Sequence, residues 1–210
     1  MVGLVTVGCT GPAEPTDMGV PSPSSAPGAA ASSMTFEEAA RTLPMDGTAD
    51  LPISWDSSEI PDTEQLLAAR RSLVFGYWLR SSLDWSPIVP LGRFLHTEKH
   101  YRETLAPFAD VTDAENRSTG PLWVKVMGVE ETGTDQVRVT FCTDIGWWHR
   151  SAENKQQVRK NRANLESYVL KNVRTGDGEP RWLADQRFNP DGDREAKYGA
   201  QCTKWAQHQP

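Results

Sequence analysis

The spacing of apolar residues changes near residue 120, and this change limits the folds that the chain can adopt. Upstream, apolar residues recur at helical spacing, most clearly over residues 62–83. Downstream, residues 122–129 and 137–142 show the apolar content and alternation of β-strands. Helices followed by an antiparallel meander predict an α+β fold, with N-terminal helices packed on one face of a curved antiparallel sheet.

Three helical segments are expected before the change. Thr35 and Glu38 form a capping-box pattern that opens a short helix. Asp62, with Gln65 three residues later, is the expected cap of the longest helix. A proline-containing irregular connection separates the two. In chain order, the expected helix, connection, long helix and third helical segment cover residues 35–43, 44–61, 62–83 and 92–108.

Two hairpins are expected after the change. Residues 132–135 form a turn between the first two strands. The third strand spans residues 164–173, with Leu165 on one face and Tyr168 on the other. Residues 175–179 are a second tight turn, and residues 181–188 form the last strand. The chain therefore holds one domain of ordinary size behind a low-complexity N-terminal stretch.

Charge and hydropathy exclude two classes of protein. The net charge is −6, with both signs interspersed along the chain. Nucleic-acid binding needs a basic face, so we expect no nucleic-acid partner. The longest apolar runs are far shorter than the 18 or so residues that a transmembrane helix requires, so no transmembrane helix is predicted.

The first residues resemble the lipobox of a bacterial lipoprotein. Leu4-Val5-Thr6-Val7-Gly8-Cys9 is an apolar run that ends in a small residue and a cysteine. A stretch rich in Pro, Ser, Ala and Gly follows over residues 10–33. The resemblance implies that the signal is removed and that Cys9 is lipidated. Residues 10–33 would then form a disordered tether, and the protein would be extracytoplasmic and anchored to the cell membrane.

Two features depart from a secretory signal. Only eight residues precede Cys9, and none is Lys or Arg, whereas a signal has a positive start and about 7–15 apolar residues. Thr6 also stands where a lipobox usually has Leu. A start site assigned too far downstream explains the short segment. The alternative is a small buried cysteine in a disordered tail.

The three cysteines fit the same interpretation. If Cys9 is acylated, Cys142 and Cys202 remain as an even pair. In an oxidising compartment such a pair is expected to form a disulfide. The alternative is two buried thiols in a cytosolic protein.

The chain is also similar to a group of actinobacterial and actinophage lipoproteins with an NTF2-like (SnoaL-like) domain. The residues that carry the similarity are the long helix, the strand that ends at Asp144, the basic connection to Arg162, the last two strands and Cys202. The similarity implies a cone-shaped domain over residues 62–210 and pairing of the two downstream cysteines. Residues 1–9 are then the signal remnant, 10–33 the linker and 34–61 the connection.

Enzymes of the NTF2-like fold use a carboxylate or a His–Asp pair as general base in the cone. Such a carboxylate has a raised pKa in an apolar pocket. Asp144, Asp185 and Tyr77 are the candidates here. The alternatives are a solvated or turn-capping aspartate and a tyrosine in the core, and no catalytic residue is assigned.

His96 and His100 are four residues apart on an expected helix, and Glu103 follows. That spacing can place two imidazoles on one metal ion. The zincin pattern needs Glu directly after the first His, and here Thr97 stands there. We therefore expect two exposed histidines, no metal and no cofactor.

Trp147, Trp148, His149 and Arg150 are the predicted binding surface. Two adjacent tryptophans cannot both point in one core direction, so we expect at least one to be exposed. Aromatic residues and Arg are enriched at binding hot spots. The basic stretch over residues 150–162 suits an anionic lipid surface, an envelope polymer or an acidic partner. The alternative is a solvated linker with a tryptophan packed at the sheet edge.

Three functions fit these observations. The first is a lipid-anchored extracytoplasmic protein whose NTF2-like domain binds a small molecule, an envelope component or a protein without catalysing a reaction. The second is a SnoaL-like isomerase, cyclase or dehydratase that acts on a small lipophilic substrate. The third is a prophage-encoded envelope lipoprotein that excludes superinfecting phage. A homodimer is compatible with each of them.

Overall fold

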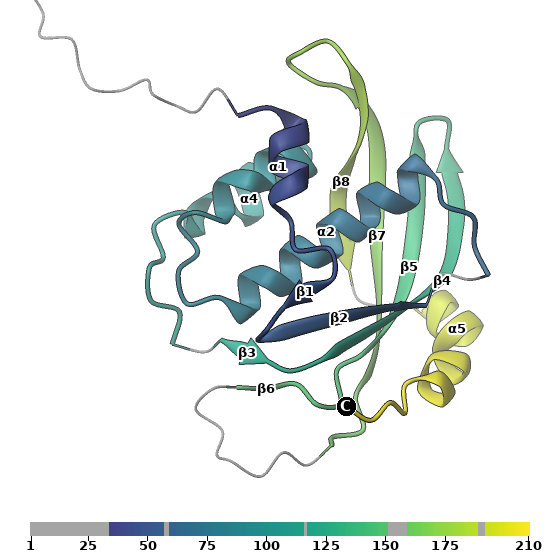
Figure 1. Ribbon diagram of the computed structural model, residues 1–210. Helices are drawn as coiled ribbons and strands as arrows, with labels where there is room; N and C mark the ends of the chain where they lie inside the picture. The colour runs from purple at the N-terminus through teal and green to yellow at the C-terminus, as the bar shows by residue number, and fades with distance from the viewer. Residues whose placement is uncertain (1–33, 57–58, 116, 151–158, 189–191) are drawn as a thin grey trace, which may run out of the picture. The chain divides into compact units, whose positions relative to one another are not determined.

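A six-stranded sheet curls around a long helix in the computed structural model (Figure 1). The structure describes residues 34–56, 59–115, 117–150, 159–188 and 192–210. Cys9 and the expected tether, residues 10–33, lie outside these ranges. Residues 34–210 form one unit, and its α+β class is as predicted.

The strand order in the described sheet is β1-β2-β4-β5-β7-β8. The sheet is mixed, because β2 runs parallel to β4 with Ile53 opposite Leu122, whereas the other neighbours are antiparallel. A separate two-stranded sheet joins β3 to β6. The strands are β1 Gly47–Thr48, β2 Leu51–Asp56, β3 Ser118–Thr119, β4 Leu122–Gly133, β5 Gln136–Asp144, β6 His149–Arg150, β7 Ala163–Arg174 and β8 Pro180–Phe188.

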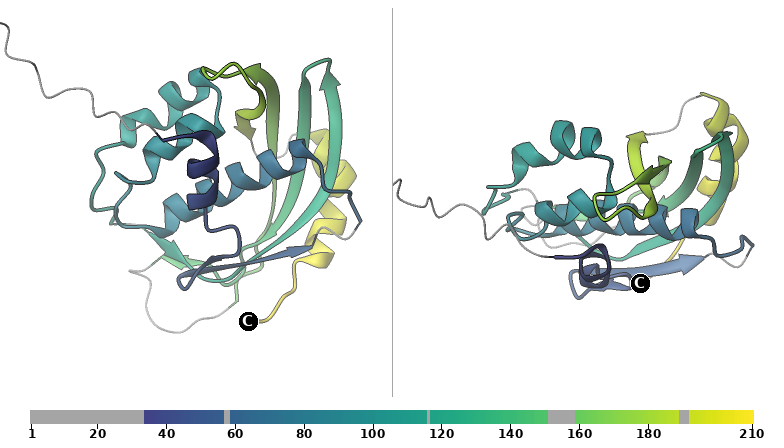
Figure 2. Two further views of the ribbon diagram at one scale, coloured as in Figure 1. Left: turned by 45° about the horizontal axis from the view of Figure 1, so that its top comes forward. Right: turned by 90° about the horizontal axis from the view of Figure 1, so that it is seen from above.

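The helices lie on both faces of the curved sheet. Helix α2 crosses the concave face, and α5 packs on the outer face (Figure 2). Leu66, Leu73 and Val74 of α2 are fully buried in the main core. The described α-helices are α1 Phe36–Thr42, α2 Glu64–Ser81, α3 Gly92–Leu95, α4 Glu98–Thr104 and α5 Gly192–Trp205, and the 3-10 helices are η1 Val89–Leu91 and η2 Ala106–Phe108.

Local sequence signals predicted several elements correctly. The Thr35 side chain accepts a hydrogen bond from the Glu38 amide, and the Glu38 carboxylate accepts one from the Thr35 amide, so the capping box is present. Helix α2 and the hairpins β4–β5 and β7–β8 also lie where the spacing placed them. These elements form from contacts between residues that are close in the sequence.

Two predictions about the order of helices and strands are wrong. Residues 44–61 are not only an irregular connection, because they contain β1 and β2. The helices are also not confined to the N-terminal side, because β2 precedes α2 and α5 follows the last strand. Leu51 and Ile53 are buried while Pro52 and Ser54 are exposed, which is the alternation of a half-buried strand.

The boundaries of two helical segments also differ from the expectation. Thr63, not Asp62, caps α2, because its hydroxyl accepts a hydrogen bond from the Leu66 amide at 3.1 Å. Residues 92–108 are not one helix. Helix α3 ends at Leu95, with His96 as its C-cap, and Thr97 caps α4. Pro107 lies in the 3-10 helix η2 that follows. A proline in this position cannot donate the helical hydrogen bond.

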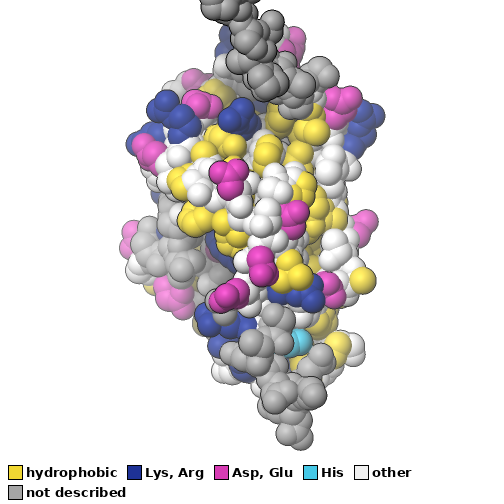
Figure 3. Space-filling model, turned by 90° about the vertical axis from the view of Figure 1, so that its left-hand side faces the viewer, with side chains coloured by type: hydrophobic (Ala, Val, Ile, Leu, Met, Phe, Trp, Pro, Cys, Tyr) yellow, Lys and Arg dark blue, Asp and Glu magenta, His cyan; other side chains and the backbone are white. Residues whose placement is uncertain are grey.

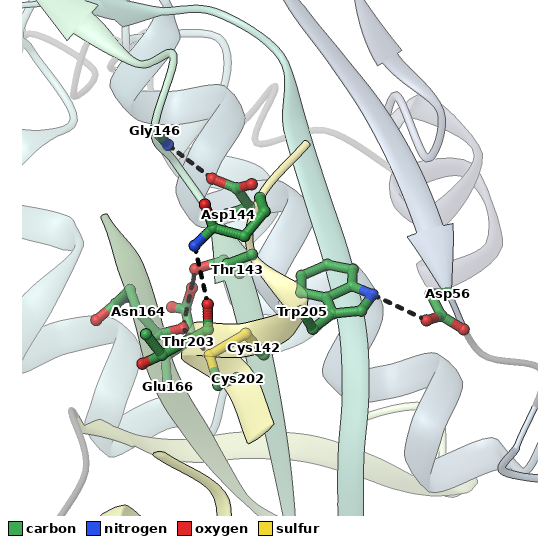
Figure 4. Close-up of a disulfide and its surroundings, with 12 residues drawn as sticks. Asp56, Cys142, Thr143, Asp144, Gly146, Asn164, Glu166, Cys202, Thr203 and Trp205 are labelled. Carbon is green, nitrogen blue, oxygen red and sulfur yellow. Dashed lines mark hydrogen bonds between the residues drawn. A yellow bond between two sulfur atoms is a disulfide. The ribbon is translucent and has the colours of Figure 1, made fainter. Parts of the chain in front are cut away.

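A disulfide joins the outer helix to the sheet, as the cysteine count predicted. Cys142 of β5 is bonded to Cys202 of α5 (Figure 4). Gly128 of β4 lets α5 approach closely, since a Cβ there would lie 2.2 Å from the hydroxyl of Tyr198. The Trp205 indole extends the attachment by donating to Asp56 of β2 at 3.1 Å. Helix α5 is therefore held covalently and by side-chain contacts.

Removal of this disulfide should destabilise the domain. The bridge spans 60 residues of sequence, and closing a loop of that length stabilises a fold by about 4 kcal/mol in the chain-entropy model. Denaturant unfolding of the variant Cys142→Ser/Cys202→Ser should show a loss of this order, and the oxidised wild-type protein should fall to the same stability when reductant is added. Equal stability with and without the bridge would contradict the prediction.

Candidate functional site

A buried carboxylate lies between α2 and the concave face of the sheet. Glu166 is on β7, on the strand face that it shares with Tyr168, and it is fully buried. A charged group in such a place is unstable unless ion pairs and hydrogen bonds compensate for lost hydration. The residues around Glu166 are therefore expected to form a polar cluster that compensates its charge.

Partners from three other elements surround Glu166. Arg187 of β8 donates two hydrogen bonds to Oε2, from Nε at 2.9 Å and Nη2 at 2.6 Å. The Tyr77 hydroxyl of α2 donates to Oε1 at 2.7 Å. Thr143 of β5 lies 3.1 Å from the Tyr77 hydroxyl and 3.4 Å from Oε1. One carboxylate thus connects the long helix to three neighbouring strands.

The titration behaviour of this cluster indicates a fixed ion pair. Burial, and then the negative charge of Glu166, raises the pKa of Tyr77 well above its ordinary value. Burial opposes the charge of Arg187, but Tyr168 and Glu166 outweigh it and raise the pKa of the guanidinium. Tyr77 therefore stays a neutral donor and Arg187 stays a cation at neutral pH. Both groups therefore serve as hydrogen-bond donors that hold the Glu166 carboxylate in place.

A cavity of about 680 Å³ opens beside this cluster. We call it the arginine pocket. Ser118, His149 and Asn164 contribute polar groups to its lining, and Ile145 is its aliphatic member. The residues that give it its character are two aromatic side chains and four arginines: Tyr77, Trp148, Arg80, Arg150, Arg162 and Arg187.

Three of the four arginines have no acidic partner within the part of the chain that the structure describes. Arg187 is paired with Glu166 at 2.6 Å. Arg80, Arg150 and Arg162 form no ion pair with a described carboxylate, and Arg80 lies over the ring of Tyr77 at 5.5 Å. In a chain of net charge −6, this gathering of unpaired positive charge is the property of the pocket that a ligand can use.

Trp148 forms the wall of the pocket and is itself firmly held. It is 7% exposed and packs edge-on against Tyr77, with ring centroids 4.9 Å apart. Its indole nitrogen donates to the carbonyl of Gly120 at 3.1 Å. Gly120 has φ +135°, and a Cβ there would lie 2.5 Å from the Trp147 carbonyl oxygen. Only glycine lets the chain pass so close, and this contact positions β6 at the pocket rim.

The structure divides the predicted binding surface in two. Trp148, His149 and Arg150 line the arginine pocket, and Tyr77, predicted only as a weak catalytic candidate, joins them. Trp147 is not part of the lining, since its indole nitrogen donates to the His208 carbonyl near the C-terminus at 3.0 Å. The expectation that one tryptophan is exposed is wrong: Trp148 is buried and Trp147 is half-buried.

Asp144 is a buried anchor for the C-terminal residues. Its carboxylate accepts a hydrogen bond from the amide of Gly146 at 2.9 Å (Figure 4). It also accepts hydrogen bonds from the amide of His208 at 3.0 Å and from Arg159 Nη2 at 3.0 Å. Burial alone would raise the pKa of Asp144, but these hydrogen bonds outweigh it and hold the pKa below its ordinary value. A general base at neutral pH needs the opposite shift.

Asp185 is held in a similar way at another place on the sheet. Its Oδ1 accepts one hydrogen bond from the Thr97 hydroxyl at 2.8 Å, and its Oδ2 lies 2.8 Å from Lys171 Nζ. Burial raises its pKa, but Lys171 and Thr97 outweigh this and keep it below the ordinary value. The structure does not bring Asp144, Asp185 and Tyr77 together in one cavity, because only Tyr77 lines the arginine pocket.

The two histidines differ from the expectation. His96 precedes α4 and is 4% exposed, so it is not an exposed helical residue. Its ring stacks on His100 at 5.1 Å, and burial, with His100 beside it, lowers the pKa of His96 to about 3. Glu103 is exposed on α4. Among the described residues, no group of three or more His, Cys, Asp or Glu side chains is placed to hold a metal ion.

An exposed apolar surface is a second candidate interaction site. In Figure 3, hydrophobic side chains form a patch with acidic groups among them, and Lys and Arg gather above and below it. Leu83 and Phe108 are 46% and 45% exposed. Exposed apolar side chains alone do not say what covers them. A homodimer therefore remains a prediction, and the arginine pocket is the stronger candidate site.

Sequence reasoning missed the residues at the base of the site. Glu166 and Arg187 were not singled out, although a glutamate between Leu165 and Tyr168 in an apolar strand was a usable signal. Arg80, in the last turn of α2, was not singled out either. The basic stretch did include Arg162, but Glu153 and Lys155 from that stretch lie outside the described residues.

No protein-family model, curated protein or solved structure matches this chain. No described helix has the length and apolar character required to span a bilayer.

Substitution Asp144→Asn should destabilise the protein in a pH-dependent way. At pH 7 the variant should lose about 3 kcal/mol, because Arg159 is left without its buried partner charge. The folded pKa of Asp144 is lowered, so its stabilisation is complete above the unfolded pKa, about 3.9, and is lost as the pH falls through the folded pKa. Urea unfolding across this range should therefore show the two proteins converging in acid. The exposed Asp113→Asn is the control, and a pH-independent gap would contradict the assignment.

Substitution Tyr77→Phe should also destabilise the protein. It removes the hydrogen bond to Glu166, and a bond to a charged group contributes about 1.5–3 kcal/mol. Tyr101→Phe is the matched control, since Tyr101 is equally buried but its hydroxyl bonds to no described residue. Chemical denaturation should separate the two variants by that amount, and equal losses would argue against the role given to Tyr77.

Proposed function

We propose that this protein is a lipid-anchored extracytoplasmic binding protein whose domain holds an anionic ligand in the arginine pocket. The observation that carries the proposal is the cavity lined by Arg80, Arg150 and Arg162, none of which has an acidic partner among the described residues. Unpaired guanidinium groups attract carboxylate, sulfate or phosphate groups, and their planar donors fit such groups well.

The carboxylates of the domain favour binding over catalysis. Glu166 is paired with Arg187, and hydrogen bonds hold the pKa values of Asp144 and Asp185 low. General-base catalysis needs a carboxylate poised near neutral pH. The SnoaL-like enzyme hypothesis therefore has less support than the binding hypothesis.

Two observations support the wider interpretation. The Cys142–Cys202 disulfide is typical of proteins that mature in an oxidising compartment, which agrees with export and with an anchor at Cys9. A curved sheet with a long helix on its concave face is compatible with an NTF2-like cone. The parallel strand β2 and the outer helix α5 are additions to that proposed plan.

Calorimetric titration tests the proposal directly. The full chain, at low ionic strength, should bind at least one of citrate, sulfate and phosphate, and added salt should weaken the binding by screening. Arg80→Gln and Arg162→Gln should each weaken it by about tenfold or more, as expected for loss of a charged hydrogen bond.

Arg102→Gln is the matched control, because Arg102 is exposed on α4, pairs with Glu98 and is not part of the pocket lining. It should bind as tightly as the wild-type protein. If no anion binds, or if Arg102→Gln weakens binding as much as the pocket variants do, the arginine pocket is not the binding site.

A further inference from the structure

The charge and shape of the arginine pocket narrow the class of its ligand. We propose that the pocket takes a phosphomonoester, with the phosphoryl group among Arg80, Arg150 and Arg162 and the organic group against Trp148 and Tyr77. This inference rests on the proposed function, since it specifies which anion the same pocket holds.

The charge of the pocket favours a phosphomonoester over an anion with a single charge. Glu166 already neutralises Arg187, so among the described residues the three remaining arginines leave a surplus of positive charge at the cavity. A carboxylate or sulfate ester carries one negative charge, whereas a phosphomonoester carries about −1.5 to −2 at neutral pH. The phosphomonoester therefore compensates more of the surplus in a single group.

The arginines approach the pocket from separate elements of the fold. Arg80 is in the last turn of α2, Arg150 is in β6, and Arg162 immediately precedes β7. Ser118 faces Arg150 across the small sheet and adds a hydroxyl to the lining. Donors from separate elements suit the three oxygens of a tetrahedral phosphoryl group better than the two oxygens of a planar carboxylate.

The size of the cavity favours a ligand larger than inorganic phosphate. The cavity of about 680 Å³ falls in the range of small-molecule sites, about 300–1,000 Å³, and far exceeds what inorganic phosphate fills. Trp148 and Tyr77 offer an aromatic wall beside the arginines. A ligand with an organic group next to its phosphate uses both parts of the pocket, whereas free phosphate uses one.

Two sources can supply this chemistry: a soluble phosphate ester and a lipid with a phosphomonoester headgroup. Both present the same group to the arginines. They differ in whether the organic part is small and soluble or belongs to a bilayer, so one experiment with two arms separates them.

The soluble arm compares phenyl phosphate, phenyl sulfate and inorganic phosphate by calorimetry. It uses the full chain with Cys9→Ser, so that no lipid anchor contributes. Phenyl phosphate should bind at least about tenfold more tightly than phenyl sulfate, which has the same ring and one charge less. It should also bind more tightly than inorganic phosphate. Arg80→Gln and Arg162→Gln should reduce the preference for phosphate, and Arg102→Gln should leave it unchanged.

The vesicle arm measures co-sedimentation with phosphatidylcholine vesicles that contain either phosphatidic acid or phosphatidylglycerol. Preference for phosphatidic acid supports the phosphomonoester and identifies a lipid source. Preference for phenyl phosphate without vesicle binding supports it and identifies a soluble source.

Failure of the phosphomonoester assignment and failure of anion binding give different results. Equal binding of phenyl phosphate and phenyl sulfate, with no preference for phosphatidic acid, overturns the phosphomonoester assignment and leaves anion binding intact. Absence of binding to every anion overturns both. Circular dichroism melting of each variant separates loss of binding from loss of folding.

Discussion

The domain depends on the partners of one buried carboxylate. Glu166 has no access to solvent, so its charge is stable only because Arg187 and Tyr77 supply donors from β8 and α2. If α2 moved along the concave face, it would withdraw the Tyr77 hydroxyl and leave the charge underpartnered, at a cost of several kcal/mol. The apolar residues of α2 provide the affinity of the helix for the sheet. The polar contact selects one position for it, and that position brings Arg80 to the arginine pocket.

The outer face of the sheet is held by a different mechanism. Helix α5 contributes few buried side chains, mainly Tyr198 and Cys202, so apolar burial alone anchors it weakly. The disulfide to Cys142 and the hydrogen bond from Trp205 to Asp56 compensate for this. The chain continues past the helix to His208, where the backbone amide donates to Asp144. Covalent and polar contacts thus reinforce a small hydrophobic interface on this side.

How much of this could be predicted from sequence depends on the distance between the residues that interact. The capping box of α1 and the two long hairpins form between sequence neighbours, and their signals are local. Strand β2 pairs with β4 almost 70 residues later, and Pro52 within it argues against a strand. Helix α5 was not predicted, although its sequence carries a helical signal, since the buried Tyr198 and Cys202 are four residues apart and share one face. The cysteine pair was predicted because two cysteines remain once Cys9 is set aside, and this count carries long-range information that spacing does not.

The candidate site follows the same rule. Trp148, His149 and Arg150 were singled out, with Trp147, as one local motif, and they reach the pocket together because Trp148 directly precedes β6, which holds the other two. The partners Arg80, Arg162 and Arg187 come from other elements, and no local pattern connects them with the motif. Glu166 could be recognised as unusual within its strand, but its role depends on Arg187, 21 residues away, and on Tyr77, 89 residues away.

Residues 144–150 connect the two sides of the domain. Asp144 and Trp147 bind the C-terminal residues on the outer side, whereas Trp148 faces Tyr77 on the concave side. The adjacent tryptophans therefore serve opposite faces, which explains how both can be at least partly buried. Because Asp144 and Trp148 are separated by only three residues, the disulfide-held outer helix also fixes the position of the pocket wall. This linkage holds Trp148 in place beside three arginines that have no acidic partner among the described residues.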